Sequence, residues 1–141
     1  MVKKLSREDF LRSLELSPRL TVELLVENPQ GKLLLLKRED PPFKGHWHLP
    51  GGFLIKDETF RECISRLSKE ELGINFTSVY AEKLGLFETI GEDPRGHILH
   101  YAVKLEPSNL PKGRFFNKIP KKTIHYQKKF LIELGYIEEK Q

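Results

Sequence analysis

The chain has 141 residues, which suits a single domain over residues 1–141 with one sizeable hydrophobic core; we expect a helix at about residues 6–14 and a core over about residues 20–134. Hydrophobic residues make up 38% of the chain and charged residues 31%, a balance that excludes a disordered protein. No apolar run approaches the roughly 20 residues that a membrane-spanning helix needs, so we expect no membrane partner. The formal net charge of +4 comes from scattered lysines without interleaved aromatic residues, so we expect no nucleic-acid partner.

The single cysteine, Cys63, excludes an internal disulfide and fits a reducing, cytoplasmic compartment. The first ten residues are charged and lack the apolar stretch of a secretory signal, which agrees with that localisation. Cys63 lies near the apolar side of a predicted helix. We therefore expect a packed thiol there and not a nucleophile.

The first 37 residues predict one helix followed by two strands. The segment Ser6–Asp9 resembles a capping box and should begin the helix. Residues 20–27 predict a largely buried strand, and residues 28–31 predict a turn. Residues 32–37 should form the hairpin partner of that strand. The four consecutive leucines at 33–36 indicate that both faces of this partner are covered.

Residues 38–47 predict a loop that Pro41 and Pro42 make rigid. The paired glycines Gly51 and Gly52 follow a proline, and we expect them to let the backbone approach a ligand closely.

Residues 57–73 predict an amphipathic helix, with Asp57 as the N-cap and Gly73 as the stop in a left-handed conformation. The apolar residues that should face the core follow helical spacing and are Phe60, Ile64 and Leu67. Glu70 and Glu71 lie side by side in the last turn, where the helix dipole disfavours acids. A cation bound beside this acid pair would explain its position.

The second half of the chain predicts further strands and one more helix. The expected strands cover residues 76–89, 97–106 and 114–116, separated by loops at 90–96 and 107–113. A last helix should be capped by Thr123 and end at Gly135. Strands interleaved with helices predict a mixed β-sheet between helices, an α+β fold.

From Gly52 onward, charged and glycine residues follow a fixed spacing: Gly, five residues, Glu, seven residues, then Arg, a glutamate pair, Gly and an aliphatic residue. The residues at these positions are Gly52, Glu58, Arg66, Glu70, Glu71, Gly73 and Ile74. This pattern resembles the signature of the Nudix hydrolases, and the segment from Pro42 to Gly52 resembles what those proteins carry just before it. The resemblance implies an α/β/α sandwich with a mixed β-sheet.

The resemblance also implies a site for a divalent cation, Mg2+ or possibly Mn2+, held by the Gly51 carbonyl, Glu70 and Glu71. It assigns catalysis to Glu58, Arg66, Glu70 and Glu71, with Arg66 orienting the carboxylates through charge-assisted hydrogen bonds. The candidates for substrate binding are Arg38, Phe43, Trp47, Gly52 and Tyr101. For the single tryptophan, core packing is an equal alternative.

The signature departs from the family at Leu67, where Glu is usual, and at Ser68. Positions 67, 70 and 71 are neighbours on a helix, so Leu67 removes the central member of a carboxylate cluster and predicts fewer or weaker metal ions. A leucine at this position of the signature resembles the GDP-mannose mannosyl hydrolase branch of the family. Members of that branch cleave the sugar C–O bond. That branch has an Arg where this chain has Phe53, and a histidine base that residues 107–113 lack. Other candidates for a base are His97, His100, Glu92 and Asp93, each with a structural role as its alternative.

Three functions remain open. The first is metal-dependent hydrolysis of a nucleoside diphosphate linked to another moiety, such as a nucleotide sugar of the GDP-mannose type, with C–O cleavage. The second is cleavage of a phosphoanhydride in another nucleotide, which the intact glutamates favour. The third is a non-catalytic nucleotide-sugar sensor, because Leu67 weakens the site. In each case the partner is a small nucleotide, and the resemblance suggests a homodimer.

Overall fold

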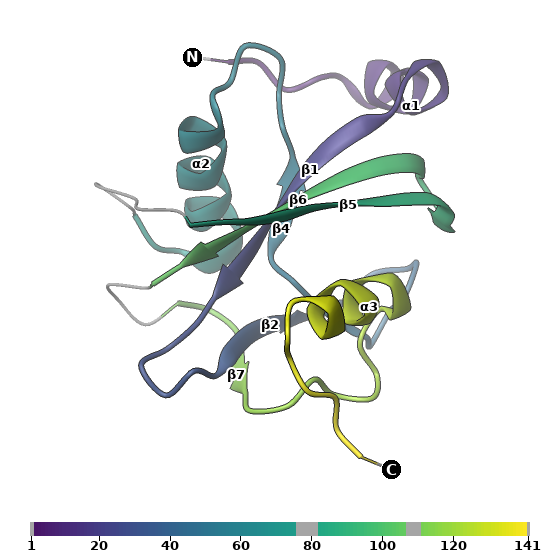
Figure 1. Ribbon diagram of the computed structural model, residues 1–141. Helices are drawn as coiled ribbons and strands as arrows, with labels where there is room; N and C mark the ends of the chain where they lie inside the picture. The colour runs from purple at the N-terminus through teal and green to yellow at the C-terminus, as the bar shows by residue number, and fades with distance from the viewer. Residues whose placement is uncertain (1, 76–81, 107–110, 141) are drawn as a thin grey trace.

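The computed structural model describes residues 2–75, 82–106 and 111–140 (Figure 1). The start of the strand expected at 76–89 and most of the loop expected at 107–113 lie outside the described residues. The elements are α1 (Arg7–Leu16), β1 (Arg19–Val26), β2 (Leu33–Lys37), β3 (Trp47–His48), β4 (Gly51–Phe53), α2 (Phe60–Leu72), β5 (Glu82–Asp93), β6 (Gly96–Leu105), β7 (Arg114–Phe116) and α3 (His125–Glu133). Within the described ranges, no helix is long and apolar enough to cross a membrane.

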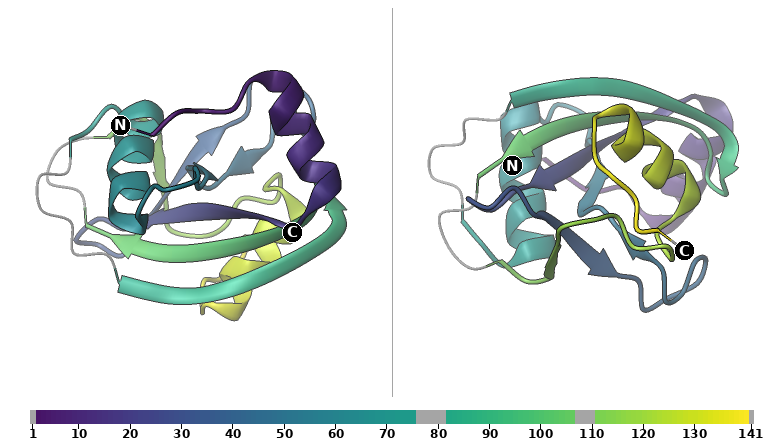
Figure 2. Two further views of the ribbon diagram at one scale, coloured as in Figure 1. Left: turned by 90° about the horizontal axis from the view of Figure 1, so that it is seen from above. Right: turned by 60° about the horizontal axis from the view of Figure 1, so that its bottom comes forward.

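A mixed four-stranded sheet forms the centre of the molecule, in the order β4-β1-β6-β5. β1 runs parallel to β6 and antiparallel to β4, and β6 is antiparallel to β5. Because strand residues alternate between faces, Val22 and Leu24 pack with α2, whereas Leu25 packs with α3. The two helices therefore cover opposite faces of the sheet, as Figures 1 and 2 show. The predicted α+β fold with a mixed sheet between helices is confirmed.

The predicted hairpin between the first two strands is wrong. β1 and β2 are paired only by a bridge between Glu27 and Leu33, and β2 instead lies in a second sheet of order β3-β2-β7. β6 pairs with β1 along its whole length and β4 takes the opposite edge at residues 21–23, so β2 pairs only beyond the end of β1. The leucines are nevertheless covered on both faces: Leu34 joins the cluster under α2, and Leu33 and Leu35 join the cluster under α3.

Asp57 is not the N-cap of α2, because the helix begins at Phe60 and Asp57 lies in the preceding loop with a positive φ of 70°. Thr59 caps the helix instead, because its hydroxyl accepts the Glu62 N–H while the Glu62 carboxylate accepts the Thr59 N–H. The expected stop is confirmed, since Gly73 takes a left-handed conformation with φ 69°. The same helix buries Cys63 completely, as expected for a packed thiol.

The other helix and loop predictions are partly correct. Ser6 caps α1, and its hydroxyl accepts the Asp9 N–H. Thr123 does not cap α3, because its hydroxyl donates to the Pro120 carbonyl, and the helix begins two residues later. The loop expected at 90–96 is shorter than predicted, because β5 continues through Asp93 and leaves only a tight turn before β6.

The paired glycines of β4 are required by close packing. A Cβ atom at Gly51 would lie 2.5 Å from the Val22 carbonyl oxygen and 2.7 Å from a Glu23 carboxylate oxygen. A Cβ atom at Gly52 would lie 2.7 Å from a methyl carbon of Leu67 on α2. Two side-chain-free residues thus let β4 lie between β1 and α2 at the outer edge of the sheet.

We predict that Gly51→Ala lowers the free energy of unfolding by about 1–3 kcal/mol, because the new methyl group overlaps backbone atoms that cannot move away. Gly85→Ala is the matched control, since its Cβ would meet only the Phe87 ring at 3.6 Å, an ordinary contact distance. Urea unfolding of the two variants measures the difference, and equal stabilities would contradict this account of β4.

Candidate active site

The candidate site lies along β4, the edge strand of the central sheet, where the C-terminal turn of α2 meets the glycine pair. Glu71 is half-buried there and lines the same two pockets as Gly51 and Gly52. The short strand is fixed by its pairing with β1, in which Glu23 lies opposite Gly51. The sheet edge therefore brings a backbone carbonyl and helix carboxylates to one place.

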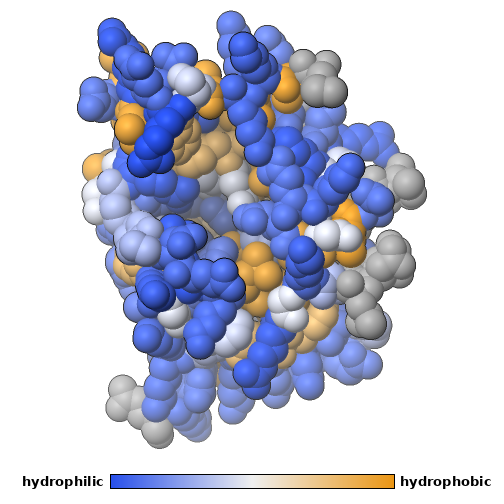
Figure 3. Space-filling view, turned by 180° about the vertical axis from the view of Figure 1, so that it is seen from behind, coloured by the Kyte–Doolittle hydropathy of each residue, from blue (hydrophilic) through white to orange (hydrophobic). Residues whose placement is uncertain are grey.

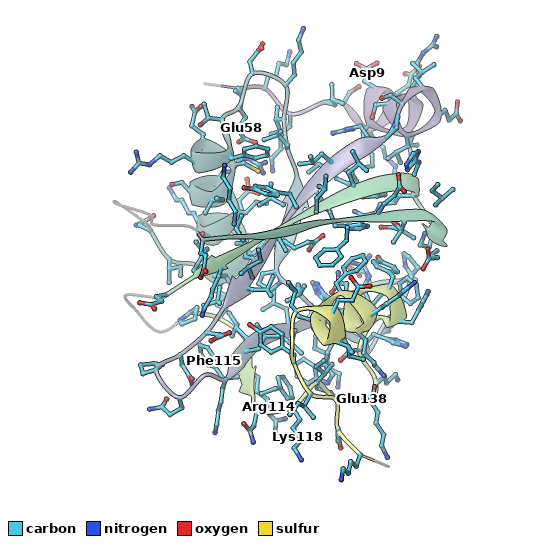
Figure 4. All side chains as sticks on the ribbon, in the orientation of Figure 1. Asp9, Glu58, Arg114, Phe115, Lys118 and Glu138 are labelled. Atoms are coloured by element: carbon cyan, nitrogen blue, oxygen red, sulfur yellow. The ribbon has the colours of Figure 1, made fainter. Side chains whose placement is uncertain are left out.

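Arg66 and Glu58 form a buried ion pair that ties α2 to the loop preceding it. Arg66 Nε donates to Glu58 Oε2 at 2.7 Å and Arg66 Nη2 donates to Glu58 Oε1 at 3.0 Å, while the Glu58 side chain is only 1% exposed. Burial by itself would raise the pKa of Glu58, but the hydrogen bonds from Arg66 and from the Ile55 N–H outweigh it and lower that pKa. Glu58, labelled in Figure 4 beside the start of α2, is thus held ionised.

Arg66 also connects the helix to the strand and to the acid pair. Its Nη2 donates to the Phe53 carbonyl at 2.9 Å, and its Nη1 donates to Glu70 Oε2 at 3.3 Å. Glu70 also forms an ion pair with Lys4, whose Nζ lies 2.9 Å from Glu70 Oε1, and the Glu70 side chain is 41% exposed. Because two cations already engage Glu70, it is the weaker of the two candidate metal ligands.

Glu71 lies in surroundings that favour a bound cation. Burial raises the pKa of Glu71, and the neighbouring acids Glu70 and Glu23 add to the shift, while the Gly51 N–H and Lys4 oppose it. The ionised carboxylate is therefore destabilised, and a divalent cation beside it would relieve that cost.

The donor set fits an open Mg2+ or Mn2+ site. Across the described ranges, no three His, Cys, Asp or Glu side chains converge to enclose a metal ion. Mg2+ is commonly held by one or two carboxylates together with substrate phosphates, and not by a complete protein cage. Glu71 and the Gly51 carbonyl, with Glu70 beside them, could supply the protein part of such a site. The Leu67 side chain cannot be a ligand, because it has no donor atom, and it packs in the core under α2.

Two pockets flank this edge. The larger, about 980 Å³, lies between α1 and α2, and its lining includes the cationic residues Lys3, Lys4, Arg7 and Arg19. The smaller, about 180 Å³, lies on the side of α3 and is lined by Glu23, Tyr126 and Gln127 among others. Both share Gly51, Gly52 and Glu71. Seen from behind, the molecule is hollowed, with hydrophobic residues inside a largely hydrophilic rim (Figure 3).

The predicted substrate-binding residues are divided between this site and the core. Arg38 and Phe43 line the smaller pocket with Gly52, although the Arg38 guanidinium donates to the carbonyls of Pro41 and Pro42. Trp47 packs at 4.7 Å from the Phe116 ring, and Tyr101 packs at 4.7 Å from the Phe60 ring. Neither Trp47 nor Tyr101 is among the residues that line these two pockets.

Three of the four candidate bases have structural partners, and the fourth, Glu92, is exposed. His100 is fully buried and hydrogen-bonded, His97 contacts Glu88 at 2.8 Å, and Asp93 accepts from Arg95 and Tyr126. The pocket residues that the sequence analysis missed are Glu23, His48, Arg95 and Gln127. For Glu23 a signal existed, because it is an acid in the middle of a strand that is mostly apolar. The other three residues come to the pocket through contacts between segments that are distant in sequence.

A half-buried acid next to a carbonyl, at a sheet edge between two pockets, is an arrangement that can support metal-assisted chemistry on a phosphorylated substrate. Residues 17–123 match the NUDIX domain, and the chain belongs to the Nudix family. It is 32% identical over 138 residues to an ADP-ribose pyrophosphatase from Methanocaldococcus jannaschii, covering 89% of this chain and 80% of that protein. The chain is a Nudix hydrolase.

Two further proteins are similar. The chain is 38% identical over 71 residues to the low-salt glycan biosynthesis protein Agl8 from Haloferax volcanii, covering 50% of this chain and 44% of that protein. A MutT Nudix hydrolase from Burkholderia pseudomallei superposes with a TM-score of 0.72 at 24% identity, covering 84% of this chain and 98% of that one. The second likeness shows the shared fold alone.

We predict that Arg66→Met lowers the free energy of unfolding by about 3–5 kcal/mol at neutral pH, because it leaves Glu58 buried without its partner. Arg66 lowers the pKa of Glu58, so the pair stabilises the fold above the ordinary glutamate pKa and this contribution is lost as the pH falls through the lowered pKa. The difference between variant and wild type should therefore shrink at acid pH.

Urea unfolding at neutral and acid pH measures this difference, with Arg61→Met as the control because Arg61 is an exposed arginine of the same helix. Equal losses for the two variants would show that the buried pair is not what holds α2 in place.

Proposed function

We propose that this Nudix hydrolase uses a divalent cation to hydrolyse a nucleoside diphosphate linked to a sugar, with ADP-ribose as the first candidate. The observation that carries the proposal is the pair of pockets on either side of one acidic edge. A substrate of this class has a diphosphate between two bulky ends. It could place its phosphates at Glu71 and Gly51 and one end in each pocket.

The residues of the chain have separate roles in this proposal. Glu71 and the Gly51 carbonyl would hold Mg2+ or Mn2+, which supplies charge neutralisation for the diphosphate and its leaving group when bound. Glu58 positions Arg66, and Arg66 in turn holds Glu70 and the Phe53 carbonyl. Lys4, at the rim of the larger pocket, places a positive charge where a phosphate would enter.

The ADP-ribose pyrophosphatase relative supports cleavage of the phosphoanhydride bond, because the similarity covers most of both chains. Attack at phosphorus would convert ADP-ribose into AMP and ribose 5-phosphate. The intact Glu58, Arg66, Glu70 and Glu71 agree with this chemistry.

Cleavage of a sugar C–O bond, as in the GDP-mannose branch, is the second candidate. Leu67 favours it, and the similarity of half the chain to a glycan biosynthesis protein supports a nucleotide sugar as substrate. Attack at the anomeric carbon would release free sugar and an intact nucleoside diphosphate.

Hydrolysis of ADP-ribose and GDP-mannose with Mg2+ or Mn2+ in 18O-labelled water tests the proposal. We expect ADP-ribose to be the better substrate, with the label in a phosphate product. Label in free mannose would establish the second candidate. No turnover of either compound or of other nucleotide sugars would contradict a nucleoside diphosphate-sugar substrate.

We predict that Glu71→Gln lowers kcat at least 100-fold, because it removes the carboxylate that would hold the cation. The variant should remain folded, and without metal its unfolding temperature should equal or exceed that of wild type, because burial and acidic neighbours destabilise the ionised Glu71. Glu133→Gln, at an exposed acid of α3, is the control. Near-normal metal-dependent turnover by a folded Glu71→Gln protein would contradict the metal assignment.

A further inference from the structure

A buried chain of hydrogen bonds ends at the wall of the smaller pocket. Thr89 Oγ1 lies 2.9 Å from His100 Nε2, and His100 Nδ1 lies 3.2 Å from Glu23 Oε1. The Thr21 hydroxyl donates to the same Glu23 oxygen at 2.9 Å. His100 is fully buried and the Glu23 side chain is 6% exposed. An acid is thus held in place from inside the protein.

One arrangement of protons gives every member of this chain a partner. The Thr89 hydroxyl donates to Nε2 of a neutral His100, and the Nδ1–H of His100 donates to Glu23 Oε1. A hydrogen on Nε2 instead would leave the Nδ1 lone pair facing Glu23 Oε1. His100 Nδ1 also lies 3.2 Å from Thr21 Oγ1, so its hydrogen can be shared between that hydroxyl and Glu23 Oε1. In both cases Glu23 is an oriented carboxylate held by a hydrogen-bonded cluster from three strands.

The other oxygen of Glu23 is the one that faces the ligand space. Oε2 lies 2.7 Å from the place that a Cβ of residue 51 would fill, so the carboxylate reaches over Gly51 into the smaller pocket that Glu71 also lines. Within residues 2–75, 82–106 and 111–140, Oε2 has no hydrogen-bond partner. Oε2 is therefore the Glu23 oxygen that can accept a hydrogen bond from a ligand in this pocket.

The rest of the smaller pocket suits an uncharged group. Phe43 and Ile124 supply apolar walls, and the Gln127 side-chain oxygen accepts the Leu49 N–H at 2.7 Å, which leaves its amide hydrogens free to donate. A phosphate here would be repelled by Glu23. The smaller pocket also has Arg38 and Arg95 in its lining, but Arg38 donates to the carbonyls of Pro41 and Pro42 and Arg95 is paired with Asp93. The larger pocket has the cationic residues Lys3, Lys4 and Arg7.

We infer that Glu23 is a specificity-determining residue that accepts a hydrogen bond from the nucleoside end of the substrate, seated in the smaller pocket, and that His100 is its positioning residue. This inference rests on the proposed nucleoside diphosphate-sugar substrate. The group that binds Glu23 is an uncharged hydrogen-bond donor. Either an exocyclic amine of the base or a ribose hydroxyl can supply it. The same geometry separates this role from metal binding, because Glu23 reaches the edge from the face opposite α2.

Glu23→Gln tests the role while keeping the shape of the side chain. We expect the Kd of ADP-ribose, measured by calorimetry in the presence of a chelator, to rise about 10-fold, and KM with Mn2+ to rise by a similar factor while kcat stays within about 2-fold. The Kd of Mn2+ for the free protein should be unchanged. Glu88→Gln, an exposed acid on β5 that lines neither pocket, is the matched control.

His100→Phe tests the positioning role, because a phenyl ring fits beside Tyr126 and Phe130, whose rings lie 5.6 and 4.9 Å from the imidazole. We expect KM and Kd to rise as they do for Glu23→Gln, but by a smaller factor. An unchanged Kd in a folded His100→Phe protein would overturn the positioning role.

Substrate analogues identify the donor. If inosine diphosphate ribose, which lacks the 6-amino group, binds wild type more weakly than ADP-ribose and Glu23→Gln removes that preference, the donor is the amine. If 2′-deoxyadenosine diphosphate ribose shows this behaviour, the donor is the ribose hydroxyl. Either result supports the inference.

Three results would overturn the inference. They are equal Kd values for ADP-ribose in wild type and Glu23→Gln, a collapse of kcat at unchanged KM, or loss of Mn2+ binding, the last two of which would place Glu23 in the metal site. Failure of wild type to bind or hydrolyse any nucleoside diphosphate-sugar would instead overturn the proposed function itself.

Discussion

The buried ion pair between Arg66 and Glu58 is the interaction on which the geometry of the site depends. It is bidentate, with the Glu58 side chain 1% exposed and the Arg66 side chain 20% exposed, and the same guanidinium also binds the Phe53 carbonyl of β4 and the Glu70 carboxylate of α2. One side chain thus fixes the position of the helix relative to the edge strand. Breaking such a pair from one side costs about 3–5 kcal/mol, a large share of the stability of a typical domain. Arg66 therefore holds the helix acids next to the glycine backbone.

The site also depends on the glycine pair of β4, which allows this strand to pack closely against its neighbours. Because Gly51 and Gly52 carry no side chain, β4 can lie against β1 and Leu67 and still leave its outer edge open. An edge strand is reachable from both faces of its sheet, and here each face has a pocket. A cationic pocket on one side and a pocket with an oriented acceptor on the other give the two ends of a substrate different surroundings. The proposed function follows from this asymmetry about a shared acidic edge.

Much of this arrangement could be predicted from the sequence because it depends on local spacing. The positions of Glu58, Arg66 and the acid pair follow from one helix and its preceding loop, and Gly73 ends that helix by its own backbone freedom. The capping error was also local: Thr59 with Glu62 forms a capping box, which outweighs Asp57. The failed hairpin was different, since pairing depended on which edges of β1 other strands had taken. Glu23 and His100, 77 residues apart, meet only through the register of β1 and β6.

A crystal structure of the protein with Mn2+ and α,β-methylene ADP-ribose, whose diphosphate bridge cannot be hydrolysed, would test the central claim most directly. We expect Mn2+ bound to the Gly51 carbonyl and Glu71, the bridge lying along β4, adenosine in the smaller pocket beside Glu23, and ribose toward Lys4 and Arg7 in the larger pocket. Anomalous scattering from manganese would locate the ion independently of the ligand. A cation bound away from Gly51 and Glu71, or both ends of the ligand in one pocket, would contradict it.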